Sequence, residues 1–375
     1  MSTATAPAPS TPTAQDTTPF LSPRQRVWRR FKKHRMAMGA GVVLIVMYLV
    51  AIFASFLAPY TDSHEYRDLA LAPPTPIHVI HEGRFIGPFI YRAERRFDPE
   101  TLLMSYRVDR EHPHPVKLFP RGDVHKILGI MPTSRHLYGA EDAQVFLLGT
   151  DQMGRDLFSR ILYGSRVSLT VGIVAMVIYI PLGLVIGGTA GFFGGWIDNV
   201  LMRIVEALMA FPSFYLLLAL FAATQKLEIS SVQRYLLITA ILSLLAWTGL
   251  ARVIRGMVLS IKQNEYIEAA RASGASSWWI IRKHVLPQTS TWVIVSASLA
   301  VPSFILGESA LSMLGVGVQE PAASWGNMLQ QALDIPSLTL YPWLTAPGFF
   351  ITLAIVAFNF LGDGLRDAFD TKRRI

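Results

Sequence analysis

The sequence predicts an all-α polytopic membrane protein with six transmembrane helices. Hydrophobic residues make up 51% of the 375 positions and charged residues only 16%, whereas soluble domains carry roughly 25% charged residues. The charges also leave six long gaps that contain no Asp, Glu, Lys or Arg. These gaps are 37–59, 167–197, 207–225, 235–251, 285–307 and 335–362. A helix needs about 20 mainly apolar residues to cross a bilayer, with a range of roughly 17–25, so six membrane spans are favoured over six buried helices of a soluble protein.

The basic residues lie close to the ends of these gaps and predict the orientation. Seven of them precede the first gap, from Arg24 to Arg35, and no acidic residue follows Asp16 in that segment. With six spans, both termini then lie in the cytoplasm, and 18 basic and 8 acidic residues collect there. The positive-inside rule therefore accounts for the net charge of +8. We expect membrane lipid as a partner and no nucleic acid.

The gaps divide the chain into four parts. Residues 1–23, rich in Ala, Thr and Pro, are expected to be a disordered tail, and 24–59 form a basic segment and the first transmembrane helix. Residues 60–164 form an extracytoplasmic insertion, in which short apolar runs broken by Gly87 and Pro88 predict a small β-rich unit. Residues 165–375 hold the other five spans.

The histidines of the insertion indicate neither a cofactor nor a resident metal. Seven of the nine histidines lie here, and the pairs His78/His81 and His112/His114 have the spacing of metal ligands. Histidines scattered through loops are the favoured interpretation. The chain contains no cysteine, which excludes disulfides and thiolate chemistry.

The end of the insertion resembles a phosphate-binding loop in spacing only. Gly149 and Gly154 have the right separation, but Arg155 and Asp156 stand where Lys and Ser or Thr are needed. We expect Thr150 or Asp151 to cap a helix. That helix is predicted to be amphipathic, with 157–162 apolar on one face and Arg155, Asp156 and Arg160 on the other, and to lie along the outer membrane surface.

Within the spans, small residues and prolines carry the main signals. Glycines recur every fourth residue in the second span, a spacing that permits close approach of a partner subunit or a neighbouring helix; they are Gly183, Gly187, Gly191 and Gly195. Prolines are expected to kink or interrupt three spans, and they are Pro181, Pro212 and Pro302.

Arg203 and Glu206 are spaced to pair on a helix, and Glu308 is expected to face a water-filled vestibule. Ionisable groups are too few for a proton relay, which disfavours an ion-coupled secondary transporter, and no catalytic constellation indicates an intramembrane enzyme.

The connection 252–291 is far longer than the roughly 2–8 residues that usually join two helices. Residues 265–272 are good helix formers, and Gly274 ends that helix or lets the chain turn left-handed. A second helix then runs to Pro287 and into the fifth span. A short helix, a bend and another helix together predict a docking element, and a merely structural connector is the less favoured alternative.

This connection resembles the EAA signature of binding-protein-dependent ABC importer permeases. The matching positions are Glu268, Ala269 and Ala270, then Gly274, then Leu286 and Pro287. Segments 149–156, 307–317, 324–328 and 362–367 also match the C-type subunit of the dipeptide/oligopeptide permease family. The insertion is longer than in the commonest members of that family.

The resemblance implies a type I importer fold of the MetI-like kind and a non-catalytic permease subunit in the bacterial cytoplasmic membrane. Its implied partners are a homologous second permease, two ATP-binding cassette ATPases and an extracytoplasmic solute-binding protein. Short peptides are the implied substrate, and nickel is the alternative within the family. The implied ATPase-coupling residues are Glu265, Glu268, Ala269, Ala270, Gly274, Leu286 and Pro287.

Overall fold

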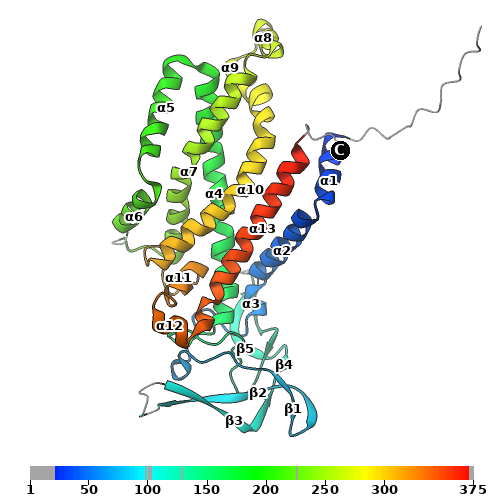
Figure 1. Ribbon diagram of the computed structural model, residues 1–375, viewed down its shortest axis with the longest axis vertical. Helices are drawn as coiled ribbons and strands as arrows, with labels where there is room; N and C mark the ends of the chain where they lie inside the picture. The colour runs from blue at the N-terminus through cyan, green and yellow to red at the C-terminus, as the bar shows by residue number, and fades with distance from the viewer. Residues whose placement is uncertain (1–21, 98, 100–103, 128–129, 225–226, 371–375) are drawn as a thin grey trace, which may run out of the picture.

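A computed structural model describes residues 22–97, 99, 104–127, 130–224 and 227–370. Helices form an elongated bundle, and the strands form a small unit at one end of it (Figure 1). The predicted all-α membrane architecture with a β-rich insertion is therefore confirmed. Residues 1–21, which make up most of the predicted disordered tail, lie outside the described part of the chain.

In the described part of the chain, five helical runs are long and apolar enough to cross a membrane. They are α2 (Arg35–Ile52), α4 (Leu157–Phe193), α7 (Ser231–Ile261), the run Ser277–Met313 and the run Pro342–Phe369. Helices α5 (Gly195–Ala210) and α6 (Ser213–Thr224) meet the same criteria as a pair that is bent by 84°. Counting this pair as one broken span gives the six predicted spans.

The third span differs from the prediction in both extent and shape. It begins at Gly195 rather than at residue 207, and it breaks before Pro212. Phe211 adopts an extended conformation with ψ of 134°, because the proline ring disfavours the helical region for the preceding residue. Pro181 and Pro302, in contrast, lie inside the continuous helices α4 and α10.

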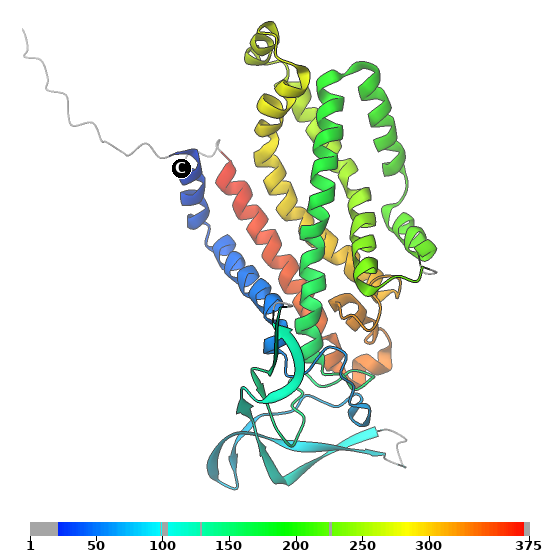
Figure 2. The ribbon, with the colours of Figure 1, turned by 180° about the vertical axis from the view of Figure 1, so that it is seen from behind.

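Helix α4 lies in the middle of the bundle. It packs most extensively against α7 and also contacts α10 (Leu286–Met313) and α2, while α13 (Ala346–Phe369) packs against α2 and α10. Figure 2 shows α4 running beside α7 on the reverse side of the molecule. The core between these helices is formed by fully buried aliphatic side chains, including Leu169, Val171, Ile254 and Val301.

A short amphipathic helix precedes the first span. Helix α1 (Pro23–Lys33) begins with a capping box between Ser22 and Gln25, and the chain bends at His34 before α2. Phe31 and Ala37 pack on Ala368 near the end of α13. This approach is close, because a Cβ at Gly364 would lie 2.1 Å from the Cβ of Ala37.

Among its described residues, the β-rich unit contains three small antiparallel sheets. The largest has the order β1 (His78–His81), β2 (Arg84–Phe97), β3 (Met104–Pro115). Strand β4 (Lys117–Leu118) pairs with β7 (Tyr138–Gly139), and β5 (Arg121–Ile127) pairs with β6 (Met131–Arg135). Glu82 and Gly83 both have positive φ, as the two-residue turn of a hairpin requires. The backbone amide of Leu137 donates to the carbonyl of Phe56 and so ties this unit to α3 (Ala54–Leu57).

The remaining short helices lie at the two ends of the bundle. Helix α8 (Glu265–Ala272) projects at the end opposite the strands, followed by α9 (Ser277–Ile280) and a π-helical turn, Ile281–Val285 (Figure 1). Helices α11 (Trp325–Gln330) and α12 (Ile335–Leu340) lie at the strand end. Short 3₁₀ turns occur at Arg67–Leu69 and Pro342–Thr345.

Candidate functional site

The predicted docking element is an exposed helical finger at one end of the molecule. Helix α8 covers Glu265–Ala272 and stands beyond the ends of α7 and α10 (Figures 1 and 2). Its first turn carries Glu265 and Glu268, both exposed, and acidic side chains stabilise that end of a helix through its dipole. Ala269 is exposed as well, and Ala270 is half-buried. Ile267 is fully buried and anchors the helix to the bundle.

Gly274 ends this helix through a Schellman motif. Its backbone amide donates to the carbonyl of Arg271, and the amide of Ala275 donates to the carbonyl of Ala270 at 3.1 Å. Gly274 has φ of +81°, a conformation that favours glycine because it lacks a Cβ. A Cβ built at this position meets no atom within 4 Å. The requirement for glycine is therefore one of backbone conformation and not of space.

Aromatic and cationic contacts hold the finger against the end of α4. The guanidinium of Arg271 lies 5.0 Å from the ring centre of Phe192, and the rings of Trp278 and Phe193 are 6.0 Å apart. The ammonium of Lys262 donates to the carbonyl of Gly191 at 2.8 Å and thereby satisfies a free carbonyl at the helix end. These contacts connect α8 and the segments on either side of it to the end of α4.

The chain continues from α8 into α10 through two short helical segments. Ser276 caps α9, and the π-helical turn continues without a break into α10, whose first two residues are Leu286 and Pro287. The side chain of Leu286 is half-buried and packs on the bundle core, while Pro287 is exposed. Pro287 has no backbone amide to donate, and it lies just after the π-helical turn.

The glycine stripe of the second span faces α7. A Cβ at Gly183 would lie 2.5 Å from the side chain of Leu250, and one at Gly187 would lie 2.3 Å from the carbonyl oxygen of Ala251. Gly191 is similarly tight against Arg255 and Val258. A neighbouring helix of the same chain therefore occupies this face. Gly195 does not share it, since it follows the end of α4 and has open space around it.

An ion pair that the sequence does not predict connects α5 and α7 at the same end of the bundle. Arg255 of α7 makes a bidentate contact with Asp198 of α5, with nitrogen–oxygen distances of 2.5 and 2.6 Å. Asp198 is buried. Asp198 directly follows one charge-free gap, and Arg255 lies four positions beyond the end of another, but nothing in their spacing reveals that they meet. The predicted pair Arg203–Glu206 is also present, at 3.1 Å and largely exposed.

At the strand end, the predicted amphipathic surface helix is wrong. Residues 157–162 are the first turns of α4, and Arg155, Asp156 and Arg160 are all buried. Both arginines bind Glu320, which lies in the loop after α10, and Arg155 also binds Asp151 at 2.7 Å. The helix cap is Asp156 rather than Thr150 or Asp151. Burial raises the pKa of Asp156 to about 7.

Glu308 also lies elsewhere than expected. It is inside α10, fully buried, and not in a vestibule after the span. Its carboxylate accepts hydrogen bonds from Ser312 at 2.7 Å and Ser168 at 3.4 Å. The same Ser168 hydroxyl accepts from the backbone amide of Trp325, so the carboxylate belongs to a polar network that joins α4, α10 and α11.

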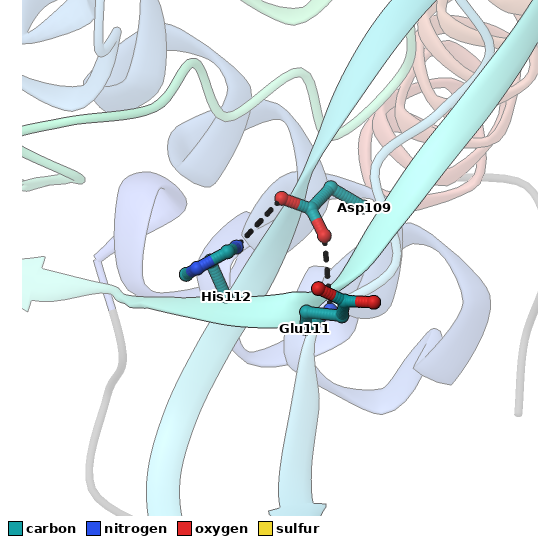
Figure 3. A group of neighbouring side chains, drawn as sticks. All are labelled: Asp109, Glu111 and His112. Atoms are coloured by element: carbon teal, nitrogen blue, oxygen red, sulfur yellow. Dashed lines mark hydrogen bonds and ion pairs between the residues drawn. The ribbon is translucent and has the colours of Figure 1, made fainter.

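The histidine pairs suggested by the sequence do not form a shared site. His78 and His81 instead pack around the aromatic rings of Phe89 and Tyr91. His112 meets Asp109 and Glu111 on β3, with candidate ligand atoms within 4.8 Å of one another (Figure 3). Its hydrogen bond to Asp109 raises the pKa of His112 and lowers that of the carboxyl. Glu111 and His112 are exposed, and the group does not support a metal site.

Two family models match the chain. Residues 155–375 match the binding-protein-dependent transport system inner membrane component, and residues 22–74 match the N-terminal transmembrane domain of oligopeptide transport permease C. The chain belongs to this family of inner-membrane permeases. It is therefore a multi-pass, non-catalytic membrane subunit of a binding-protein-dependent transporter. The strands lie between the two matched ranges.

Curated relatives span most of the chain. A Bacillus subtilis dipeptide transport system permease protein, DppC, is 34% identical and covers 95% of this chain and 88% of its own length. A glutathione transport system permease protein, GsiD, from Pectobacterium atrosepticum is 32% identical over 94% of this chain and 92% of its own length. An oligopeptide permease, OppC, from Haemophilus influenzae is 43% identical over 60% of this chain and 70% of its own length.

A solved structure of the MetNI methionine ABC transporter, in an inward-facing conformation, also matches. Its TM-score is 0.39 at 23% identity, and the match covers 54% of this chain and 92% of the other. The fold assignment rests on the helices described above and on the family.

Proposed function

We propose that the chain is the permease through which an ATP-driven importer moves short peptides across the cytoplasmic membrane. The observation that carries this proposal is the finger itself: an exposed acidic helix, ended by a left-handed glycine and attached to α4, α7 and α10. The relatives named for dipeptide, oligopeptide and glutathione transport support a peptide substrate.

In this proposal α8 binds in a groove of a separate ATPase. Glu265, Glu268, Ala269 and Ala270 form or border the surface that enters the ATPase groove, and Gly274 sets the angle at which the helix is presented. Leu286 and Pro287 begin the helix that receives the motion. Because Arg271, Trp278 and Lys262 contact the end of α4, a displacement of α8 moves α4 and α10 together.

The proposed orientation places α1 and α8 in the cytoplasm and the strands outside. The excess of basic residues at the α8 end supports it. A complete transporter then contains a second, homologous permease, two ATPases and an extracytoplasmic solute-binding protein. The β-rich unit stands where the binding protein approaches.

Single cysteines test the coupling and the orientation together, because the natural chain has no cysteine. Ala269→Cys is expected to cross-link to the ATPase and to resist a membrane-impermeant maleimide in intact spheroplasts. The control is Val124→Cys on β5, where the side chain is 75% exposed. It is expected to react with the maleimide and not to cross-link. Labelling of Ala269→Cys from outside would contradict the orientation.

The substrate is tested on the reconstituted complex of permeases and ATPases. Uptake of a labelled dipeptide is expected to require ATP and the binding protein. Glutathione and Ni²⁺ are measured in parallel, since Ni²⁺ is the alternative substrate within the family. Accumulation of solute by the permease alone, without nucleotide, would instead indicate an ion-coupled carrier.

A further inference from the structure

A groove at the α1 end of the bundle combines apolar walls with a basic rim. Its volume is about 580 Å³, within the range of roughly 300–1,000 Å³ that is typical of small-molecule sites. Helix α1 forms one wall, α13 the second and the first turns of α10 the third. The lining of the groove includes Arg26, Val27, Trp28, Ile294, Leu365 and Phe369.

The walls expose apolar side chains that nothing in the described part of the chain covers. Trp28 is 54% exposed and Ile294 is 45% exposed. Trp28 stacks on Phe31 at a centroid distance of 5.9 Å, and the ammonium of Lys32 lies 5.2 Å from its ring centre. Tryptophan is enriched where hydrocarbon meets the polar headgroups of a bilayer.

The α1 side of the rim is positively charged. Helix α1 contains no acidic residue, and Arg26, Arg29, Lys32 and Lys33 are all exposed. Arg30 is engaged by the bundle, since it donates to the carbonyl of Asp370 at 2.7 Å. Arg26 lines the groove itself, whereas Arg29 does not. A ligand seated here would meet hydrocarbon walls and a guanidinium at its mouth.

We propose that this groove binds one anionic phospholipid, with an acyl chain between α1, α10 and α13 and the phosphate at Arg26. The proposal rests on the proposed function for its leaflet, the cytoplasmic one. Apolar walls favour a lipid over free phosphate, because only a lipid removes them from water. The lipid would connect α1 to Thr291 and Ile294 of α10, close to Leu286 and Pro287, where α10 leaves the docking finger.

The test measures bound lipid on the purified full-length chain in nanodiscs of phosphatidylcholine with one fifth phosphatidylglycerol. Native mass spectrometry is expected to find one retained phosphatidylglycerol and no comparably retained phosphatidylcholine. Arg26→Gln is expected to weaken retention about tenfold, the effect of losing one hydrogen bond of about 1.5 kcal/mol to a charged group. Ile294→Trp, which fills the groove, is expected to abolish it.

The matched control is Arg29→Gln, which makes the same charge change on the same helix outside the groove and is expected to retain the lipid. Equal losses in Arg26→Gln and Arg29→Gln would overturn the proposal in favour of general surface attraction. Equal retention of both lipids would overturn it too. Nanodiscs present both faces to lipid and contain no ATPase, so the result does not depend on the orientation or the coupling. A failed cross-link at Ala269→Cys would leave the lipid measurement intact.

Discussion

The guanidinium of Arg160 donates to the carboxylate of Glu320 at 2.9 Å, although 160 positions separate the two residues. Arg160 has no exposed surface, and its second nitrogen donates to the carbonyl of Asp62 at 3.0 Å. Arg155 binds the same carboxylate. One acidic residue of the loop after α10 thus ties that loop to the start of α4, beside the buried apolar side chains of Leu157, Ile161 and Trp325.

Removing Arg160 is therefore expected to destabilise the protein strongly. Breaking a buried pair leaves a charge without its partner, at a cost of about 3–5 kcal/mol. Because Glu320 is 39% exposed and keeps Arg155 as a partner, we expect the cost of Arg160→Met to fall at or just below the lower end of that range. The measurement is the thermal unfolding midpoint in detergent micelles.

The control for this prediction is Lys117→Gln, which breaks a pair with Glu141 of 2.7 Å whose side chains are 49% and 61% exposed. Exposed pairs contribute about 0–1 kcal/mol, so this change is expected to be small. Similar shifts in both variants would show that burial does not determine the strength of the Arg160 contact.

The architecture follows from local sequence where a local property decides it. Long apolar stretches predict spans because each span satisfies its own backbone hydrogen bonds, and Gly274 marks a helix end through its own backbone. The prediction fails where a distant partner decides the outcome. Nothing near Arg155 and Arg160 reveals Glu320, so the amphipathic pattern predicts a solvated face where the structure has a buried one. The vestibule predicted for Glu308 fails for the same reason, because Ser168 of α4 lies 140 positions away in the sequence.

The contact between α4 and α7 is expected to tolerate no side chain at Gly187. A Cβ there would lie 2.3 Å from the backbone oxygen of Ala251, so the two helices must separate. Overpacking of this kind costs about 1–3 kcal/mol, and Gly187→Ala is expected to lower the unfolding midpoint. In Gly249→Ala the new methyl group meets no atom within 4 Å. That variant is expected to be neutral or up to about 1 kcal/mol more stable, because alanine favours helix. A drop equal to that of Gly187→Ala would contradict this explanation.

Substitution at Gly274 is expected to affect coupling more than stability. A β-branched residue in the left-handed region costs about 1–2 kcal/mol, and Gly274→Val can relieve that strain by turning α8. Stimulation of ATP hydrolysis by the binding protein should then be lost in the reconstituted complex, while the variant still folds. Asparagine tolerates the left-handed region better, so Gly274→Asn should keep most of the stimulation. Normal stimulation in Gly274→Val would remove Gly274 from the coupling residues.

Asp156 is expected to make stability depend on pH. Burial raises the pKa of this carboxyl from 3.8 to about 7, so the folded state holds a proton that the unfolded state releases. Its stabilising effect is complete below about pH 4 and is lost as the pH rises to about 7, by up to about 4 kcal/mol. Asp156→Asn stays neutral and keeps the cap on the amide of Ser159, since asparagine is a strong N-cap. The unfolding midpoint of Asp156→Asn minus that of the natural protein should therefore increase from pH 4 to pH 7. A difference that stays constant over this interval would show that Asp156 does not titrate there.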